Sequence, residues 1–227
     1  MKSKSIFKFS SALILLLAMA SCGKDNYDAP ESTLMGRLVY NGAPIQVRGT
    51  GEAVQLQLYQ RGWQKSDPVR VYVTQDGTFT AKLFDGTYYL VTRDNNGPWV
   101  NARDTIQVEL RGAASVDVNV TPYFTVSGEN ISISGNTLSA SFTVSRVVSS
   151  AKIEKAYLVL SKTQFADEVN NIFRKDITEG LSEGSVSLSG DLSGNNNVAT
   201  AKFLYGRVGI KTEGTEQAIW SPVVKLK

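Results

Sequence analysis

The chain has 227 residues, with 24 basic and 21 acidic side chains, one cysteine and no histidine. The missing histidine excludes the Ser-His-Asp triad and removes the commonest general base and zinc ligand. A lone cysteine cannot supply a thiolate cluster for a metal. A carboxylate pair could still hydrolyse a glycoside, but small β-domains leave little room for a substrate cleft. We therefore expect a protein that is not an enzyme and needs no cofactor or metal.

Residues 1–21 have the three parts of a secretory signal peptide. Three lysines form a positively charged start, residues 12–20 are apolar, and Ser21 is a small residue at the cleavage point. The apolar run is much shorter than the ~20 residues that a membrane-spanning helix needs. Removing this segment leaves equal numbers of basic and acidic side chains, so charge gives no reason to expect nucleic-acid binding.

The sequence Met19-Ala20-Ser21-Cys22 resembles the lipobox of bacterial lipoproteins, with Met19 where leucine is more common. In this interpretation Cys22 carries acyl chains that anchor the protein in a membrane. The alternative is a secreted protein cut near Ala18 or Ala20 and left with a free thiol. Secreted domains normally pair their cysteines, which favours lipidation.

Residues 22–32 are polar, contain a proline and show no periodicity, so we expect a lipidated tether. Lys24, Asp25 and Asp28 resemble the short charged export signal of Bacteroidetes surface lipoproteins, although a generic solvated linker has the same composition. We expect the protein to be lipid-anchored in the outer membrane and to face the cell exterior.

Residues 33–121 predict a first β-sandwich, because short alternating segments are separated by turn-forming residues. Asp76-Gly77 and Asp85-Gly86 each indicate a tight turn. With Phe79 and Tyr88 beside them, these turns resemble those of transthyretin-like (prealbumin-like) or carboxypeptidase-regulatory-like sandwiches. Both aromatic side chains are expected in the core.

Residues 122–227 predict a second sandwich, similar to immunoglobulin or fibronectin-III domains, so the expected fold class is all-β with two β-sandwich domains in tandem. One short helix is expected after Thr163, a suitable N-cap, because four apolar residues follow at helical spacing: Phe165, Val169, Ile172 and Phe173. Residues 194–197 are expected to form a loop.

Six stretches carry a wider resemblance: residues 25–30, 33–37, 75–79, 120–123, 205–210 and 220–225. Together they are similar to a family of two-domain Bacteroidetes surface lipoproteins of unknown function, associated with SusC/SusD-like polysaccharide utilisation systems. The resemblance implies a fold and a setting, with polysaccharide and SusC/SusD-like outer-membrane proteins as partners. It supplies no known ligand, so function remains inferred by association.

The segment 93–103 has the composition of a sugar-binding loop. Such sites stack sugar rings on exposed aromatic side chains and hold hydroxyl groups with polar ones. The candidate ligand-binding residues here are Arg93, Asp94, Asn95, Asn96 and Trp99. The alternative is that Trp99 folds back over the end of the sandwich or against the second domain. Residues 94–96 could also hold calcium, but they lack the alternating spacing of a strong motif.

Trp63, in the polar segment 60–65, is the second candidate stacking residue. If both loops lie at one end of the sandwich, the two tryptophans could form one platform. Trp220, before Ser221-Pro222, is expected in the core or at a domain interface. Three tyrosines are expected on an outer sheet face, where cross-strand pairing explains them: Tyr59, Tyr72 and Tyr89.

We therefore expect a non-catalytic lipoprotein that binds a glycan or assists a SusC/SusD-like uptake complex, with Trp99 and Trp63 as stacking residues. The alternative is a structural spacer or adhesin-type module whose tryptophans are buried at an interface. Exposure of both rings on one face favours the first function, and burial of both opposes it.

Overall fold

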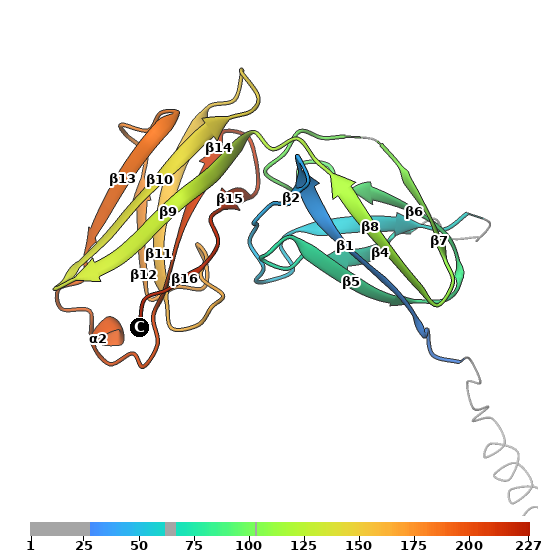
Figure 1. Cartoon of the computed structure of the whole chain (residues 1–227), viewed down its shortest axis with the longest axis horizontal. Helices are drawn as coiled ribbons and strands as arrows, with labels where there is room; N and C mark the ends of the chain where they lie inside the picture. The colour runs from blue at the N-terminus through green and yellow to red at the C-terminus, as the bar shows by residue number, and fades with distance from the viewer. Residues whose placement is uncertain (1–27, 62–66, 103) are drawn as a thin grey trace, which may run out of the picture. The chain divides into compact units, whose positions relative to one another are not determined.

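The computed structural model describes residues 28–61, 67–102 and 104–227, and it consists of two β-sandwiches in tandem with one short helix (Figure 1). The predicted fold class is confirmed. In this described part of the chain, no helix is long and apolar enough to cross a membrane. The signal segment and Cys22 lie outside the described residues.

The first sandwich is built from eight strands in two sheets. They are β1 (Ser32–Tyr40), β2 (Ala43–Pro44), β3 (Gln55–Tyr59), β4 (Val69–Tyr72), β5 (Thr78–Leu83), β6 (Gly86–Thr92), β7 (Ile106–Leu110) and β8 (Ala113–Asn119). In one sheet β1 pairs with β2 and β5 and, in parallel, with β8. The other sheet has the antiparallel order β4-β3-β6-β7.

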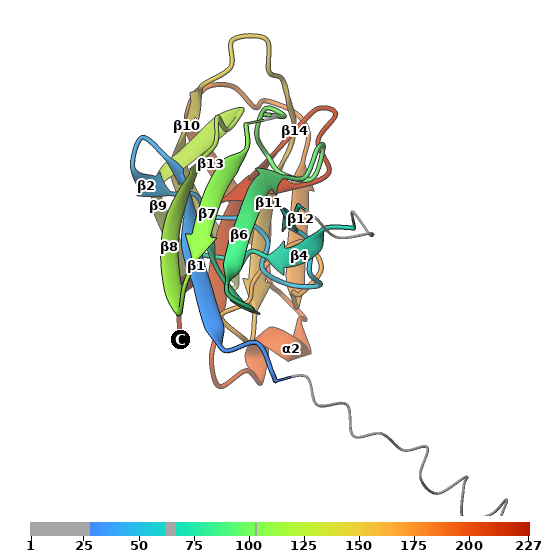
Figure 2. The same cartoon turned by 90° about the vertical axis from the view of Figure 1, so that its right-hand side faces the viewer.

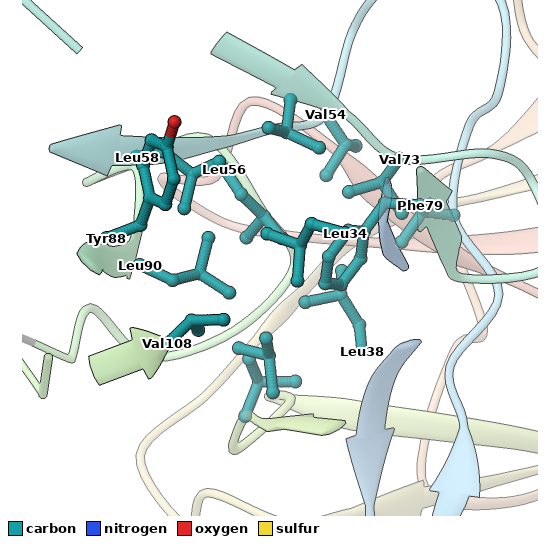
Figure 3. Packing of buried hydrophobic residues seen from close by; sticks show 14 of the residues in the cluster. Leu34, Leu38, Val54, Leu56, Leu58, Val73, Phe79, Tyr88, Leu90 and Val108 are labelled. Atoms are coloured by element: carbon teal, nitrogen blue, oxygen red, sulfur yellow. The ribbon is translucent and has the colours of Figure 1, made fainter. Parts of the chain in front are cut away.

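Alternating apolar residues from both sheets meet in one core (Figure 3). Leu56 and Leu58 point inward from β3, while Gln55, Gln57 and Tyr59, which alternate with them, are partly exposed. Phe79 and Tyr88 are 1% and 3% exposed, which confirms their predicted core positions. The Tyr88 hydroxyl remains satisfied because it donates to the carbonyl of Phe84 at 2.9 Å.

The two Asp-Gly turns are present, and each also leads the chain from one sheet to the other. Across Asp76-Gly77, Val73 forms an antiparallel bridge with Phe79, as expected of a tight hairpin turn. Asp76-Gly77 connects β4 to β5, and Asp85-Gly86 connects β5 to β6. Gly77 has a φ of +81°, and a Cβ there would lie 2.3 Å from the carbonyl oxygen of Ile45. Glycine is therefore required at this corner for both backbone conformation and space.

The second sandwich faces three strands against five. Its strands are β9 (Phe124–Ser134), β10 (Thr137–Arg146), β11 (Ile153–Ser161), β12 (Phe173–Ile177), β13 (Gly184–Asp191), β14 (Tyr205–Thr212), β15 (Ala218–Trp220) and β16 (Val224–Lys225). One sheet has the order β13-β10-β9, and the other has β12-β11-β14-β15 with β16 also paired to β14. Apolar residues from both sheets form a second core.

The helix predicted after Thr163 is wrong: no helix forms between β11 and β12. The Asp167 carboxylate accepts hydrogen bonds from the backbone N–H groups of Val169 and Asn170 at 2.9 and 2.7 Å. Such local bonds compete with helical ones. Phe165 and Val169 are also 46% and 64% exposed, so their helical spacing does not mark a buried face.

The short helix lies instead at α2 (Asn196–Ala199), where a loop was predicted. The Asn195 side chain accepts a hydrogen bond from the N–H of Val198, which caps the first turn. Asparagine is common in loops, which is why this polar run predicts one, but it is also a preferred residue for capping the first turn of a helix, as Asn195 does here.

Arg207 on β14 is fully buried where the two sandwiches meet. Its guanidinium donates to three carbonyl oxygens, those of Ser221 (2.7 Å), Ala166 (3.4 Å) and Gln75 (3.2 Å). Its Cζ lies 5.2 Å from the centre of the Trp220 ring. Burial lowers the pKa of Arg207 to about 10, so the group stays charged at neutral pH.

Replacing Arg207 with alanine should destabilise the folded chain by about 3 kcal/mol, because buried carbonyl groups would lose a charged donor. Chemical denaturation followed by tryptophan fluorescence measures this free energy. Arg37→Ala is the matched control, since its ion pair with Asp117 is exposed to solvent and should contribute little to stability. Equal losses in the two variants would contradict the assignment.

Candidate functional site

The outer face of the β4-β3-β6-β7 sheet carries aromatic, amide and charged side chains. We call it the polar sheet face; its residues are Gln55, Gln57, Tyr59, Arg70, Tyr72, Thr87, Tyr89, Val91, Gln107 and Glu109. These residues alternate with core residues along each strand and are partly or fully exposed. The strand period of two therefore places them all on one side. Strands β4, β6 and β7 of this sheet are labelled in Figure 2.

Strand register brings the tyrosines and glutamines of this face together. Tyr59 lies directly opposite Tyr89, and Gln57 lies between Arg70 and Val91 on the neighbouring strands. The Tyr59 hydroxyl donates to Gln57 Oε1 at 3.2 Å. Arg61, just after β3, places its Cζ 4.3 Å from the centre of the Tyr89 ring. Aromatic rings, hydrogen-bonding groups and a cation therefore share one exposed surface.

The far edge of the polar sheet face carries an ionised carboxylate. Glu109 accepts hydrogen bonds from Gln107 Nε2 and Thr87 Oγ1, each at 2.9 Å. These bonds, first that from Gln107 and then that from Thr87, lower the pKa of Glu109. Glu109 is therefore an anionic acceptor at neutral pH.

An open hollow of about 410 Å³ lies at the Thr92 end of this face. It is lined by Gln57, Val91, Thr92, Arg93, Asp94 and Ala102. Arg93 is half-buried and Asp94 is exposed, so two predicted site residues meet Gln57, which sequence reasoning did not single out. The hollow therefore offers a guanidinium, a carboxylate and an amide to a polar ligand.

Trp99 is not an exposed stacking residue, because it is only 2% exposed and belongs to the core of the first sandwich. Its backbone forms a bridge with Pro122. A Cβ on Gly97 would lie 2.1 Å from the indole ring, so glycine lets the backbone close over it. The alternative interpretation, a ring folded over the end of the sandwich, fits this placement.

Asn96 is also buried and serves the fold. Its Oδ1 accepts from the N–H of Gln55 at 2.7 Å, and its Nδ2 donates to the carbonyl of Ala53 at 2.8 Å. Asn95 is exposed, has a φ of +56° and exchanges hydrogen bonds with Asn101. The described residues contain no cluster of acidic residues suited to a metal ion.

The platform predicted from two tryptophans loses one of its two rings, because Trp99 is buried. Trp63 lies outside the described residues, so its part in ligand binding stays a prediction. Trp220 is 1% exposed, and its backbone N–H donates to the carbonyl of Gln46 in the first sandwich at 3.1 Å, which confirms its predicted core or interface position.

Replacing Gln107 with leucine should raise the pKa of Glu109, because the largest stabiliser of its ionised form is removed. Carboxyl NMR titration measures the midpoint. Since folding lowers this pKa, the contribution to stability is present above the unfolded-state pKa and is lost as pH falls through the folded value. Gln55→Leu, on another part of the same face, is the control. An unchanged midpoint in Gln107→Leu would contradict the hydrogen-bond assignment.

Comparison with known proteins identifies the family to which both domains belong. Residues 32–121 match the N-terminal domain of a protein family of unknown function, DUF3823, and residues 124–225 match its C-terminal domain, DUF3823_C. A DUF3823 family protein from Parabacteroides merdae is 56% identical, with a TM-score of 0.85 over 88% of this chain and 100% of that one. No curated protein matches.

More distant solved structures share the fold. A DUF3823 family protein from Bacteroides ovatus is 29% identical, with a TM-score of 0.76 over 86% of this chain and 98% of that one. A Bacteroides uniformis protein, named a candidate carbohydrate binding protein, is 18% identical, with a TM-score of 0.73 over 87% and 99% of the two chains. The chain described here belongs to the DUF3823 family, in both its N-terminal and C-terminal domains.

Proposed function

We propose that this protein is a non-catalytic, lipid-anchored glycan-binding protein of the bacterial surface, and that the polar sheet face is its binding site. The observation that carries this proposal is the exposed combination of Tyr59, Gln57 and the Arg93 hollow on one sheet. A partly open, largely flat surface suits a long polymer better than a small molecule, which needs a deeper enclosure.

The chemistry of the face fits a polyhydroxylated ligand. Hydroxyl groups can both donate and accept, and this surface supplies amide, guanidinium and carboxylate partners within a short distance. Partly exposed tyrosine rings add apolar area for the C–H faces of sugar rings. The naming of the Bacteroides uniformis relative for carbohydrate binding agrees with this proposal, although its likeness to this chain is one of fold.

The anchor and the setting rest on sequence. Cys22 after an apolar segment supports acylation, and the polar residues behind it support a tether. We extend the proposal to the outer membrane, facing the cell exterior, with SusC/SusD-like uptake proteins as partners. In that setting the protein would hold polysaccharide near an uptake complex.

A second function, a spacer or adhesin-type module, is favoured by one observation. Trp99 and Trp220 are both buried, as expected if tryptophans hold the sandwiches together instead of binding a ligand. The two functions differ in whether an isolated chain retains any polysaccharide.

The double variant Gln57→Ala, Arg93→Ala should bind polysaccharide roughly tenfold more weakly. Each substitution removes about one hydrogen bond to the ligand, and with it part of the binding free energy. The measurement is retardation of residues 23–227 in affinity gels that contain a panel of polysaccharides. Tyr59→Ala should weaken the same interaction through lost ring contact.

Phe203→Ala is the matched control for the aromatic substitution, since Phe203 is 51% exposed on the second sandwich. It should bind as the unaltered chain does. An unaltered chain that no polysaccharide retards would reject the glycan proposal and favour the spacer.

Cys22→Ala should weaken membrane binding and release the protein from the membrane fraction, because it removes the acyl chains. Each buried methylene group of such a chain contributes ~0.8 kcal/mol to membrane binding. Fractionation with mass spectrometry of the N-terminal peptide measures both location and acylation. Proteolysis of intact cells tests exposure on the outer surface. An N-terminal peptide of the unaltered protein that carries no acyl chain on Cys22 would contradict the lipid anchor.

A further inference from the structure

We infer that the turn between β5 and β6, residues 84–85, is a membrane-contact surface; we call it the Phe84 turn. It would contact the same lipid bilayer in which the protein's own acyl chains are anchored. This inference depends on the proposed acylation of Cys22. It states that the end of the first sandwich where β1 begins contacts the bilayer. The ligand class is the apolar and interfacial part of a lipid surface.

The entry point of the chain is fixed beside this turn. Ser32 opposes Leu83 at the end of β5, and its hydroxyl donates to the carboxylate of Asp85. The N–H of Gly112, in the turn between β7 and β8, donates to the same carboxylate oxygen at 2.9 Å. Lys82 Nζ donates to the carbonyl of Glu31 at 3.0 Å. The beginning of β1 and both turns therefore share one end of the sandwich (Figure 1).

Phe84 is the exposed apolar group at this end. Its side chain is 53% exposed, while its carbonyl is held by the Tyr88 hydroxyl at 2.9 Å. The backbone of the turn is thus fixed, and the ring has no place in the core below it. An exposed ring alone is common on protein surfaces, so the inference depends on its fixed place at the end where the tether joins the sandwich.

The length of chain before β1 explains why a single ring can matter. Residues 23–31 separate Cys22 from β1, and a fully extended chain spans at most ~3.5 Å per residue, or on the order of 30 Å here. A short tether gives a high effective concentration of the folded domain at the surface. A contact too weak to bind membranes alone is then populated, as occurs when an acyl chain works with a second weak signal.

Charge does not oppose the contact. Lys82 and Arg111 are exposed at this end, and their positive charges accompany the negative charges of Glu31 and Asp85. The hydrogen bond from Ser32, followed by that from Gly112, lowers the pKa of Asp85, so this carboxylate is already partnered within the fold. The contact is therefore apolar in its main part and should depend little on anionic lipid.

The test uses the mature lipidated chain in vesicles of phosphatidylethanolamine and phosphatidylglycerol, with a fraction of the lipid brominated. Because Cys22 is acylated, Arg111→Cys supplies a single free thiol for a fluorescent label at this end of the sandwich and leaves the Phe84 ring in place. Phe203→Cys, on the second sandwich and 51% exposed, is the matched control. We expect brominated lipid to quench the label at position 111 several-fold more than the label at position 203, and Phe84→Ala should remove most of this difference.

Two outcomes overturn the inference, and they are distinguishable. Protein that floats with the vesicles but shows equal quenching at both positions rejects the contact and leaves the anchor intact. Protein that does not float, and that takes up a second label at Cys22, rejects the anchor and the contact together. Quenching at position 111 that persists in vesicles without phosphatidylglycerol supports an apolar contact.

Discussion

The buried guanidinium of Arg207 is the interaction on which the arrangement of this chain depends. It joins three segments that are distant in sequence, through the carbonyl groups of Gln75, Ala166 and Ser221. A buried charge is costly unless its donors are satisfied, so these three segments must be held where they are. Asp167 and Glu168 oppose the lowering of the Arg207 pKa by burial. Glu168 also pairs with Arg48 of the first sandwich at 3.2 Å.

This constraint explains why one segment departs from its sequence pattern. The residues between β11 and β12 show helical spacing, yet they must present the carbonyl of Ala166 to Arg207 and the Asp167 side chain to Thr50. Periodicity reports which residues could share a helical face, but it cannot report that another strand requires their backbone groups. The same reasoning accounts for β14, which is buried on both faces: Val208 faces the core, and Arg207 faces the junction.

The parts predicted well from sequence depend on local patterns. Alternation at Leu56 and Leu58 and the aromatic pair Phe79 and Tyr88 indicated inward-facing positions, and these hold. The candidate site was predicted less well, because it depends on register. Tyr59 and Tyr89 were expected on an outer face, but the pairing that sets Gln57 beside the hollow of Arg93 joins strands far apart in the chain. The predicted exposure of Trp99 is wrong for a related reason. The polar residues around it do not reveal that the backbone at Gly97 packs over the indole ring.

The register of β6 also relates the proposed binding site to the proposed membrane contact. Gly86 begins the strand beside the Phe84 turn, and Thr92 ends it at the hollow. A strand rises about 3.3 Å per residue, so these two points lie on the order of 20 Å apart. Contact of the turn with a bilayer would therefore leave the hollow above the headgroups, where a soluble polymer can reach it. If the turn contacts the bilayer and β6 runs away from it, this strand would set the height of the binding surface, and changes in the tether alone would not alter that height.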